Sequence, residues 1–566
     1  MSRKFQSIVD EMHIENIPMV SPIVTISPVS ESSKYYEKHG LRIEGDGQDH
    51  TQYNTGAIAF KMTILGCAFA LAGSAMVPLM YLTLGSLIAL ELNAVELTIW
   101  MFTCILVSQG ALAPFIGPLA DLCGRKPIFL TGLVVSMIGG IACASTPNAA
   151  GFIGGQVLLG IGIIVQELLA IAIVGESVPT AKRSLYAAII LCALVPWSPG
   201  SLYASFIADT SWRWVGFVAV IWNLLTFLII AIFYHPPPRV NSLGLTKREM
   251  VRRIDFVGGL LITVGLLLFL IGINGGQDHG WTSAYVLTFI TLGLFMVLGF
   301  AVWEMFAPYP LFPRRIVHAP RPFFCMLYVI FAAGVNFVPL VAFWPIQSIA
   351  VFQSDRHQTG IDCLPIGMSI LTGAILSALL LSIIKRWVTY IMAFFCIVQT
   401  VGCACLVLIN GNDIRTAFAP IVLALIVITP DDLIASVAAL TVGLRAQAQV
   451  IGLALFYNRF VSEVTENAYD TIVPAVVELG VFNVKKIEEF VRGLTAQPIR
   501  EWTSLVPALS DPLNIELIRQ ASVACFMKSL NSLYLITIAF GVTACIASLC
   551  IGSVVEYLDN HVAVVL

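Results

Sequence analysis

One carboxylic acid lies deep within an apolar stretch of this sequence. Glu167 follows Gln166 in the apolar run 151–173, and it is the only acidic residue well away from a run's end in the first six runs. An ionised acid at the centre of a membrane helix costs about 2.5–3.5 kcal/mol even on a lenient scale. Its surroundings decide whether such a group holds or releases a proton. We expect Glu167 to couple proton movement, and the alternative is a structural hydrogen bond to a neighbouring helix.

Other polar side chains within apolar runs suit a hydrophobic, oxygenated ligand. Arg445 lies in the run 436–458, where it can pair with an acid or with an anionic substrate group, although we favour snorkelling to the interface. An apolar pocket with a few polar groups is the usual small-molecule site, whereas singly each side chain is more often part of helix packing. The substrate-cavity candidates are Gln109, Asn223, Asn336, Phe337, Trp344, Gln347 and Arg445.

A short charged turn over residues 117–126 joins the second and third apolar runs. Its sequence is GPLADLCGRK. Glycines remove side chains where helix ends approach or turn, the aspartate can accept from backbone N–H groups, and the arginine can fork onto a carboxylate or onto helix-end carbonyls. We expect a conformational latch that binds helix ends of two helix bundles, formed by Gly117, Asp121, Gly124, Arg125 and Lys126.

Composition defines the class of protein that holds these residues. The chain has 566 residues, of which 58% are hydrophobic and 11% charged, and its mean hydropathy is +0.88. These values exclude an ordinary soluble domain, and the net charge of −3 argues against a nucleic-acid partner. The 13 cysteines and 8 histidines show no metal-binding or catalytic spacing, and no P-loop occurs. We expect no enzyme activity, no cofactor and no metal.

Apolar runs long enough to cross a bilayer, about 20 residues each, recur along the chain. They predict an all-α membrane protein with 14 transmembrane helices, arranged as two six-helix bundles plus two intervening helices. The helices are expected near 57–81, 96–116, 127–145, 151–173, 186–207, 214–234, 256–274, 284–303, 323–344, 364–384, 389–409, 413–430, 436–458 and 531–553.

The same runs divide the chain into parts. We expect a disordered cytoplasmic tail over 1–55, an N-terminal bundle over 56–234, and a cytoplasmic connection with two helices over 235–322. A C-terminal bundle follows over 323–553, and a cytoplasmic tail covers 554–566. Within the second bundle, residues 460–530 form an extracellular segment whose apolar spacing predicts amphipathic helices.

Loop charges orient the helices. With the N-terminus inside, the short cytoplasmic loops carry 14 Lys and Arg residues, and the short outer loops carry 3, namely Arg213, Arg356 and Arg415. This bias agrees with the positive-inside rule and places both termini in the cytoplasm.

Several motifs resemble one branch of the major facilitator superfamily, the fungal trichothecene efflux pump family. The turn 117–126 is similar to the superfamily's loop between helices 2 and 3. Further motifs of the branch are Gln166-Glu167-Leu168, Ser211-Trp212-Arg213-Trp214, Pro236-Pro237-Pro238-Arg239-Val240-Asn241, Arg253-Ile254-Asp255-Phe256-Val257-Gly258-Gly259, Trp303-Glu304, Phe312-Pro313-Arg314-Arg315, Phe343-Trp344-Pro345-Ile346-Gln347 and Pro430-Asp431-Asp432-Leu433-Ile434-Ala435.

The resemblance implies a major facilitator fold and alternating access. It implies proton-coupled efflux of a hydrophobic secondary metabolite, mycotoxin or drug by a multi-pass protein in the plasma membrane or the vacuolar membrane. The expected partners are a hydrophobic small molecule, protons and the lipid bilayer, and we expect a monomer. A siderophore-iron transporter is the alternative.

Two departures keep a transport-deficient membrane paralogue as a further alternative. The helix-5 signature of antiporters, G-P-x-x-G-G, is reduced here to Pro199-Gly200 followed by Ser201. Helix 12 is short, since 414–429 would span about 24 Å against a hydrocarbon core of about 30 Å.

Overall fold

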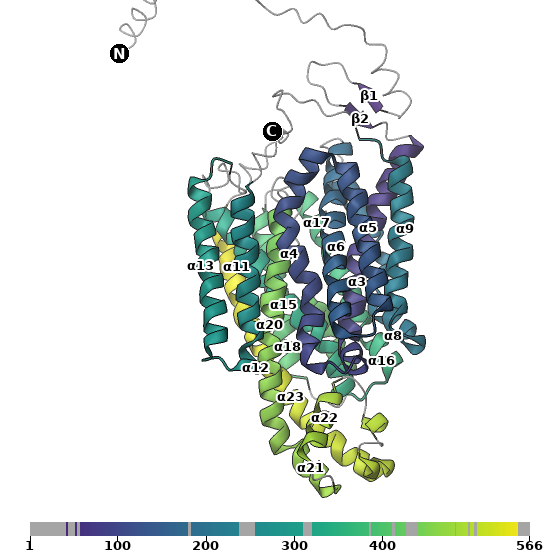
Figure 1. Ribbon diagram of the computed structural model, residues 1–566, viewed down its shortest axis with the longest axis vertical. Coiled ribbons are helices and arrows are strands. Elements are labelled where there is room, and N and C mark those ends of the chain that lie inside the picture. The colour runs from purple at the N-terminus through teal and green to yellow at the C-terminus, as the bar shows by residue number, and fades with distance from the viewer. Residues whose placement is uncertain are drawn as a thin grey trace, which may run out of the picture. The chain divides into compact units, whose positions relative to one another are not determined.

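Figure 1 shows the computed structural model of the chain, in which almost every element is a helix. Two units are distinguished, residues 1–54 and 55–566. The structure describes residues 41–43, 51–53, 57–178, 183–236, 249, 255–309, 320–383, 387–409, 414–425, 438–480, 483–495, 499–502 and 506–552.

The first unit contains a small antiparallel hairpin. Strand β1 (Leu41–Ile43) pairs with β2 (Thr51–Tyr53), and Leu41 lies opposite Tyr53. These two strands lie within the stretch for which we expected a disordered tail, and the sequence did not indicate them.

In the described part of the chain, 12 helices are long and apolar enough to cross a membrane. Helices satisfy their own backbone hydrogen bonds, which a lipid environment requires. The structure also has a helix at the two remaining expected places, α19 (Arg415–Leu425) and α20 (Ala438–Asp470). Within the described residues α19 covers 11 residues, and neither helix is among the 12, so the count of 14 membrane spans stays a prediction.

The first half of the second unit is a bundle around α6, which packs against α3, α4 and α5, while α9 packs against α3 and α5. Its fifth span is broken where Pro196 and Pro199 remove backbone donors and disfavour helix at the preceding residue. The elements of this half are α3 (Ile58–Glu91), η1 (Val95–Leu97), α4 (Thr98–Cys123), α5 (Arg125–Ser145), α6 (Ala149–Ser177), α7 (Arg183–Cys192), η3 (Val195–Trp197), α8 (Gly200–Thr210) and α9 (Trp214–Phe233).

The two intervening helices form a close pair. Helix α11 (Phe256–Asn274) packs along α13 (Ala284–Phe306), and a Cβ at Gly272 would lie 2.6 Å from Ile290. The short α12 (Gly276–His279) connects them. On its other side α11 packs against α4 and α20, where Thr263 donates to the carbonyl of Ala111 at 2.9 Å. The pair therefore lies beside both halves, as Figure 1 shows.

The second half is built around α15 (Pro320–Ala350), which packs against α20 and α23 (Pro512–Cys550). Helix α18 (Val388–Val407) packs on α23 and on α19. The span that crosses next to α8 consists of α16 (Arg356–Asp362) and α17 (Leu364–Ile383).

The two longest helices of this half extend well beyond the hydrocarbon core. Helix α20 has 33 residues and α23 has 39, so at about 1.5 Å per residue both exceed the hydrocarbon core of about 30 Å. We expected the last span to begin near 531 because its polar first turns lack membrane hydropathy, and the structure begins α23 at Pro512.

The projecting ends carry α21 (Ile472–Glu478), α22 (Val484–Gly493), η7 (Ile499–Trp502) and η8 (Pro507–Ser510). Helix α22 is amphipathic as expected, since Ile487 and Phe490 are buried whereas Lys485 and Glu488 are exposed. We call α21, α22, η7 and η8 together the cap, and the end of the second unit that contains them the cap end. The end with the α4–α5 turn at Gly124 is the turn end.

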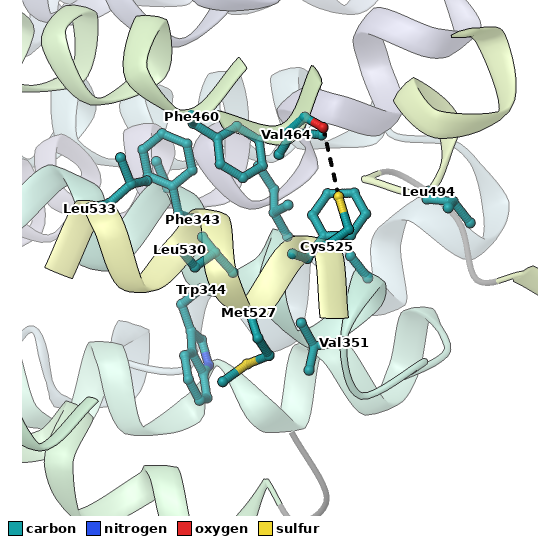
Figure 2. Close-up of a cluster of buried hydrophobic side chains, with 14 of the residues drawn as sticks. Phe343, Trp344, Val351, Phe460, Val464, Leu494, Cys525, Met527, Leu530 and Leu533 are labelled. Carbon is teal, nitrogen blue, oxygen red and sulfur yellow. Dashed lines mark hydrogen bonds between the residues drawn. The ribbon is translucent and has the colours of Figure 1, made fainter. Parts of the chain in front are cut away.

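One hydrophobic core joins the cap to the membrane helices of the second half. Figure 2 shows Phe343, Phe460 and Leu533 close together, with Val464 and Cys525 beside them. The rings of Phe343 and Phe460 lie 5.0 Å apart, and the Cys525 thiol donates to the carbonyl of Val464 at 3.7 Å. The same core reaches Leu494 after α22, so the cap and the second half form one packed body.

Several motifs and loops from the sequence analysis lie outside the described residues. They are 237–241 of the proline-rich motif, 312–315, 430–435, and loop cations that include Lys182, Arg239, Lys247, Arg314, Lys385 and Arg386. The orientation inferred from those charges stays a prediction.

Candidate functional site

The structure brings together the two charged residues that the sequence placed inside membrane helices. Arg445 on α20 binds Glu167 on α6 through its Nη2 and the Oε1 of the acid, although 278 positions separate them. The acid is 17% and the arginine 26% exposed. Pairing with an acid, one of the orientations considered for Arg445, is present in the structure. The pair links the first half to the second.

Backbones approach closely around this pair. Gly334 on α15 lies against α20, where an added Cβ would be 3.0 Å from the carbonyl oxygen of Arg445. Between the halves, Gly110 on α4 packs directly on Gln447 of α20, and Gly443 packs on Ala113. Small residues let two helices meet at this distance. The α4–α20 contact therefore lies within two residues of Arg445, which pairs with Glu167 of α6.

Amide side chains near the pair retain hydrogen-bonding capacity. Within the described part of the chain, Gln166 and Asn336 are 1% exposed and neither has a partner for its side-chain oxygen or nitrogen. The Oε1 of Gln447, 6% exposed, is also without a partner there. A buried polar atom without a partner is costly, so each such atom needs a reason. These amides lie on α6, α15 and α20.

The other cavity candidates differ in burial and in the hydrogen bonds that they form. Gln109 is buried and Phe337 half-buried. Asn223 donates to Ala219 and Ser136, and its Oδ1 has no partner among the described residues. Trp344 and Gln347 are fully buried and already bonded, to the carbonyl of Asp362 at 2.8 Å and to Tyr534 at 2.5 Å. Both are enclosed within the second half.

At the turn end, the charged turn makes contacts within the first half. Gly124 has φ 97°, a conformation that glycine adopts readily. Arg125 forms an ion pair with Glu176 at the end of α6, and Lys126 donates to the carbonyl of Ala231 on α9 at 2.8 Å. A Cβ at Gly117 would meet nothing within 4 Å. A latch to the other half that involves Asp121 and Arg125 stays a prediction.

At the cap end, charged residues that the sequence analysis did not select link the two halves. His357 on α16 lies 2.9 Å from Asp209 on α8, and Arg356 donates to the carbonyl of Ala208 at 3.0 Å. The ring of Phe206 contacts His357, with centroids 4.9 Å apart. Each of these residues lies at a helix end, where charged side chains are common because the helix leaves the membrane there. The sequence signal was weak for that reason.

The structure also assigns a packing role to one family motif. Arg213 of Ser211-Trp212-Arg213-Trp214 donates to the carbonyl of Ala144 at 3.1 Å, and Trp212 donates to Glu91 at 2.8 Å. The motif thus closes the end of α5 and holds α3 beside it. In the described residues, no group of three or more His, Cys, Asp or Glu side chains could hold a metal ion.

Two helical halves that meet along α4, α6, α8, α16 and α20, with a charged pair between them, define a multi-pass membrane transporter of the major facilitator class. The sequence model of the fungal trichothecene efflux pump family (TRI12) matches residues 54–566. The chain belongs to the fungal trichothecene efflux pump family.

Individual proteins are similar to parts of this chain. The trichothecene efflux pump TRI12 of Trichoderma arundinaceum is 25% identical over 82% of this chain and 81% of its own length. Its counterpart from Fusarium sporotrichioides is 23% identical over 89% and 86%. The aspyridones efflux protein of Neocamarosporium betae is 27% identical over 55% of this chain and 56% of its own. Among solved structures, the xylose transporter XylE from E. coli aligns with a TM-score of 0.47 and 14% identity, over 89% of this chain and all of that one.

Proposed function

We propose that this protein exports a hydrophobic secondary metabolite in exchange for protons by alternating access, with Glu167 as the proton-coupling residue. The observation that carries the proposal is the ion pair between Glu167 and Arg445, because it joins the two halves that must move relative to each other. The family of the chain and the efflux function named for its relatives favour export.

The pair gives a physical route from proton binding to movement. While Glu167 is ionised, the two charges neutralise each other and hold α6 against α20. A proton on the acid removes its charge, so Arg445 loses a charge-assisted hydrogen bond and the link between the halves weakens. Loss of the proton on the other side restores the link. Proton binding thereby changes which arrangement of the halves is preferred.

The neighbouring amides suit an oxygenated, mostly apolar substrate. Asn336, Gln166 and Gln447 have unpartnered polar atoms in the described part of the chain, and a substrate's carbonyl or hydroxyl groups could satisfy them. Gln109 and Phe337 would contribute amide and ring surface nearby, and Asn223 a further acceptor. The relatives' names point to the same substrate class, a fungal secondary metabolite.

Further parts of the proposal concern the surroundings of the site. We infer that the turn end faces the cytoplasm, because the predicted inner loops carry most of the short-loop cations. We infer that Asp121, Arg125 and their neighbours act as a latch in the outward-open state. The protein would act as a monomer in the lipid bilayer, in the plasma membrane rather than the vacuolar membrane, and as a transporter rather than an enzyme.

Transport in sealed vesicles under an imposed proton gradient tests the proposal. Purified protein is reconstituted, and the accumulation of a labelled trichothecene and of a ferric siderophore is measured in parallel. We expect gradient-dependent movement of the trichothecene, abolished by a protonophore. Accumulation of the siderophore alone would move the assignment to iron transport. Movement of neither compound, by protein that is correctly inserted, would favour a transport-deficient paralogue.

A further inference from the structure

A buried carboxylate organises the bend between α15 and α16. Asp362 is fully buried, and it accepts hydrogen bonds from Ser348 at 2.6 Å, Ser354 at 2.7 Å and Gln358 at 2.8 Å. No basic side chain bonds to it among the described residues. A buried charge is costly unless several donors satisfy it, so the fold of this segment depends on all three. We call residues 351–363 the elbow.

The elbow adopts an unusual backbone and is fixed to the cap. Gln353 has φ 55°, which non-glycine residues rarely adopt. Its side chain accepts from the backbone N–H of Ile499 at 2.9 Å and donates to the carbonyl of Ala350 at 2.9 Å. Strained residues persist where their surroundings hold them, and they often mark functional segments. The cap thus holds one end of the elbow, and Asp362 holds the other.

The face of the elbow that carries Arg356 and His357 contacts the opposite half. Arg356 and His357 bind the last turn of α8 at Ala208 and Asp209. Close packing continues along α16, where a Cβ at Gly360 would lie 2.8 Å from Ser205. Helix α16 has only 7 residues and ends at Asp362, so the hydrogen bonds of Asp362 help to fix its position. The carboxylate therefore positions the two residues that reach across.

The space behind these contacts is small. A cavity of about 40 Å³ lies between α3 and α15, and its lining includes Ser86, Leu87, Ile346, Ser354, Thr359 and Thr495. A water needs roughly 10–15 Å³ of such space, so only a few waters fit. A cavity of this size cannot hold a metabolite.

We propose that the elbow is the gate at the cap end of the transporter, and that Asp362 is its positioning residue, which holds Arg356 and His357 against α8. The inference rests on the proposed function, because a gate has a role only in a chain that alternates access. Opening would separate Asp209 from His357 and Ala208 from Arg356, while the bonds of Asp362 keep the elbow folded and ready to close again.

Chemical labelling measures the gate without substrate or proton gradient. Ser86→Cys places a thiol in the cavity wall, and a membrane-impermeant maleimide is added on the side of the cap end to full-length protein in sealed membranes. The chain without this substitution gives the background from native cysteines. We expect Asp209→Asn, His357→Ala and Asp362→Asn each to raise the labelling rate of the introduced thiol roughly five- to tenfold, as the loss of one net hydrogen bond would.

Two controls separate gating from general damage. His357→Gln retains a donor for Asp209 and should label nearly as slowly as the parent. Glu516→Gln changes an exposed acid at the same end, whose bonds to Arg519 and Gln520 lie away from α8, and should have no effect. If Asp362→Asn fails to insert, Ser348→Ala and Ser354→Ala each remove one donor and should raise labelling to a smaller extent.

Different labelling results overturn the gate itself and the positioning role of Asp362. Labelling at the parent rate in both Asp209→Asn and His357→Ala overturns the gate. Faster labelling in these two, but parent rates in the Asp362 and serine variants, overturns the positioning role of Asp362. Since the assay needs no transport, a chain that fails the vesicle test can still show a gate, and a chain that passes it can still lack one.

Discussion

The two ends of the transporter use charged residues differently. At the turn end, Arg125 and Lys126 bind α6 and α9, which belong to their own half. At the cap end, Arg356 and His357 bind α8, which belongs to the opposite half. Contacts within a half keep that half rigid, whereas contacts between halves decide which end is open. The difference indicates that the cap end is held closed here.

The pair Glu167–Arg445 lies between these ends and also crosses between the halves. Unlike the cap-end pair of Asp209 and His357, which is 39% and 47% exposed, it is mostly shielded from water. Water screens exposed pairs, so they contribute little, whereas the loss of one partner from a buried pair is costly. The largest effects are therefore expected at the central pair and smaller ones at the turn.

The largest effect is expected for Arg445→Ala. This change leaves the Glu167 carboxylate without its partner, which costs about 3–5 kcal/mol in fully buried pairs and less here because both side chains keep some exposure. We expect proton-driven transport to fall to background and the thermal midpoint to drop. The double variant Glu167→Gln with Arg445→Ala should regain most of the midpoint in a detergent melting assay. Additive losses in the double variant would contradict a direct pair.

The next largest effect is expected where α4 meets α20. Gly110→Val would push a branched side chain into the amide of Gln447, and overpacking of this kind costs about 1–3 kcal/mol. Transport should slow because the two halves can no longer approach at this point. Gly154→Val is the matched control, since an added Cβ there meets nothing within 4 Å. Equal melting temperatures and transport rates for both variants would contradict the close contact between the halves.

A smaller effect is expected at the turn end. Arg125→Lys keeps the charge but loses the planar fork, so it should lower the transport rate, and Arg125→Ala should lower it further, by roughly tenfold. Substrate affinity should stay near the parent value, and labelling of Ser86→Cys at the cap end should not rise, because the outward-open state has lost its latch. The measurement is initial rate against substrate concentration in vesicles. Parent rates in Arg125→Ala and Asp121→Asn together would show that the latch is wrong.

Much of this architecture could be predicted from the sequence because a membrane imposes a simple pattern. Apolar runs of sufficient length predicted the helices, and the apolar spacing at Ile487 and Phe490 predicted the amphipathic α22. Hydropathy could not predict that α23 begins at Pro512, since that part of the helix packs in the cap. The elbow was placed outside the membrane helices, and its buried Asp362 could not be distinguished from an ordinary loop acid.

The candidate site was predictable only one residue at a time. Glu167 and Arg445 were both identified because a charged residue inside an apolar helix is unusual. Their pairing depends on the packing of α6 against α20, and nothing in local sequence encodes a contact across 278 positions. The sequence did not indicate the contact of His357 either, because its partner Asp209 lies in a helix that is distant in sequence. Trp344 and Gln347, two of the predicted cavity residues, form hydrogen bonds inside the second half, and the sequence did not indicate these bonds.

Substrate transport by the Glu167→Gln variant tests the central claim most directly. The amide keeps the size of the acid and one acceptor for Arg445, but it cannot bind and release a proton. Reconstituted variant and parent are compared for accumulation of labelled substrate under a proton gradient and for substrate exchange without one. We predict that the variant inserts, binds and exchanges substrate but does not accumulate it. Full gradient-driven accumulation by correctly inserted Glu167→Gln would contradict the account.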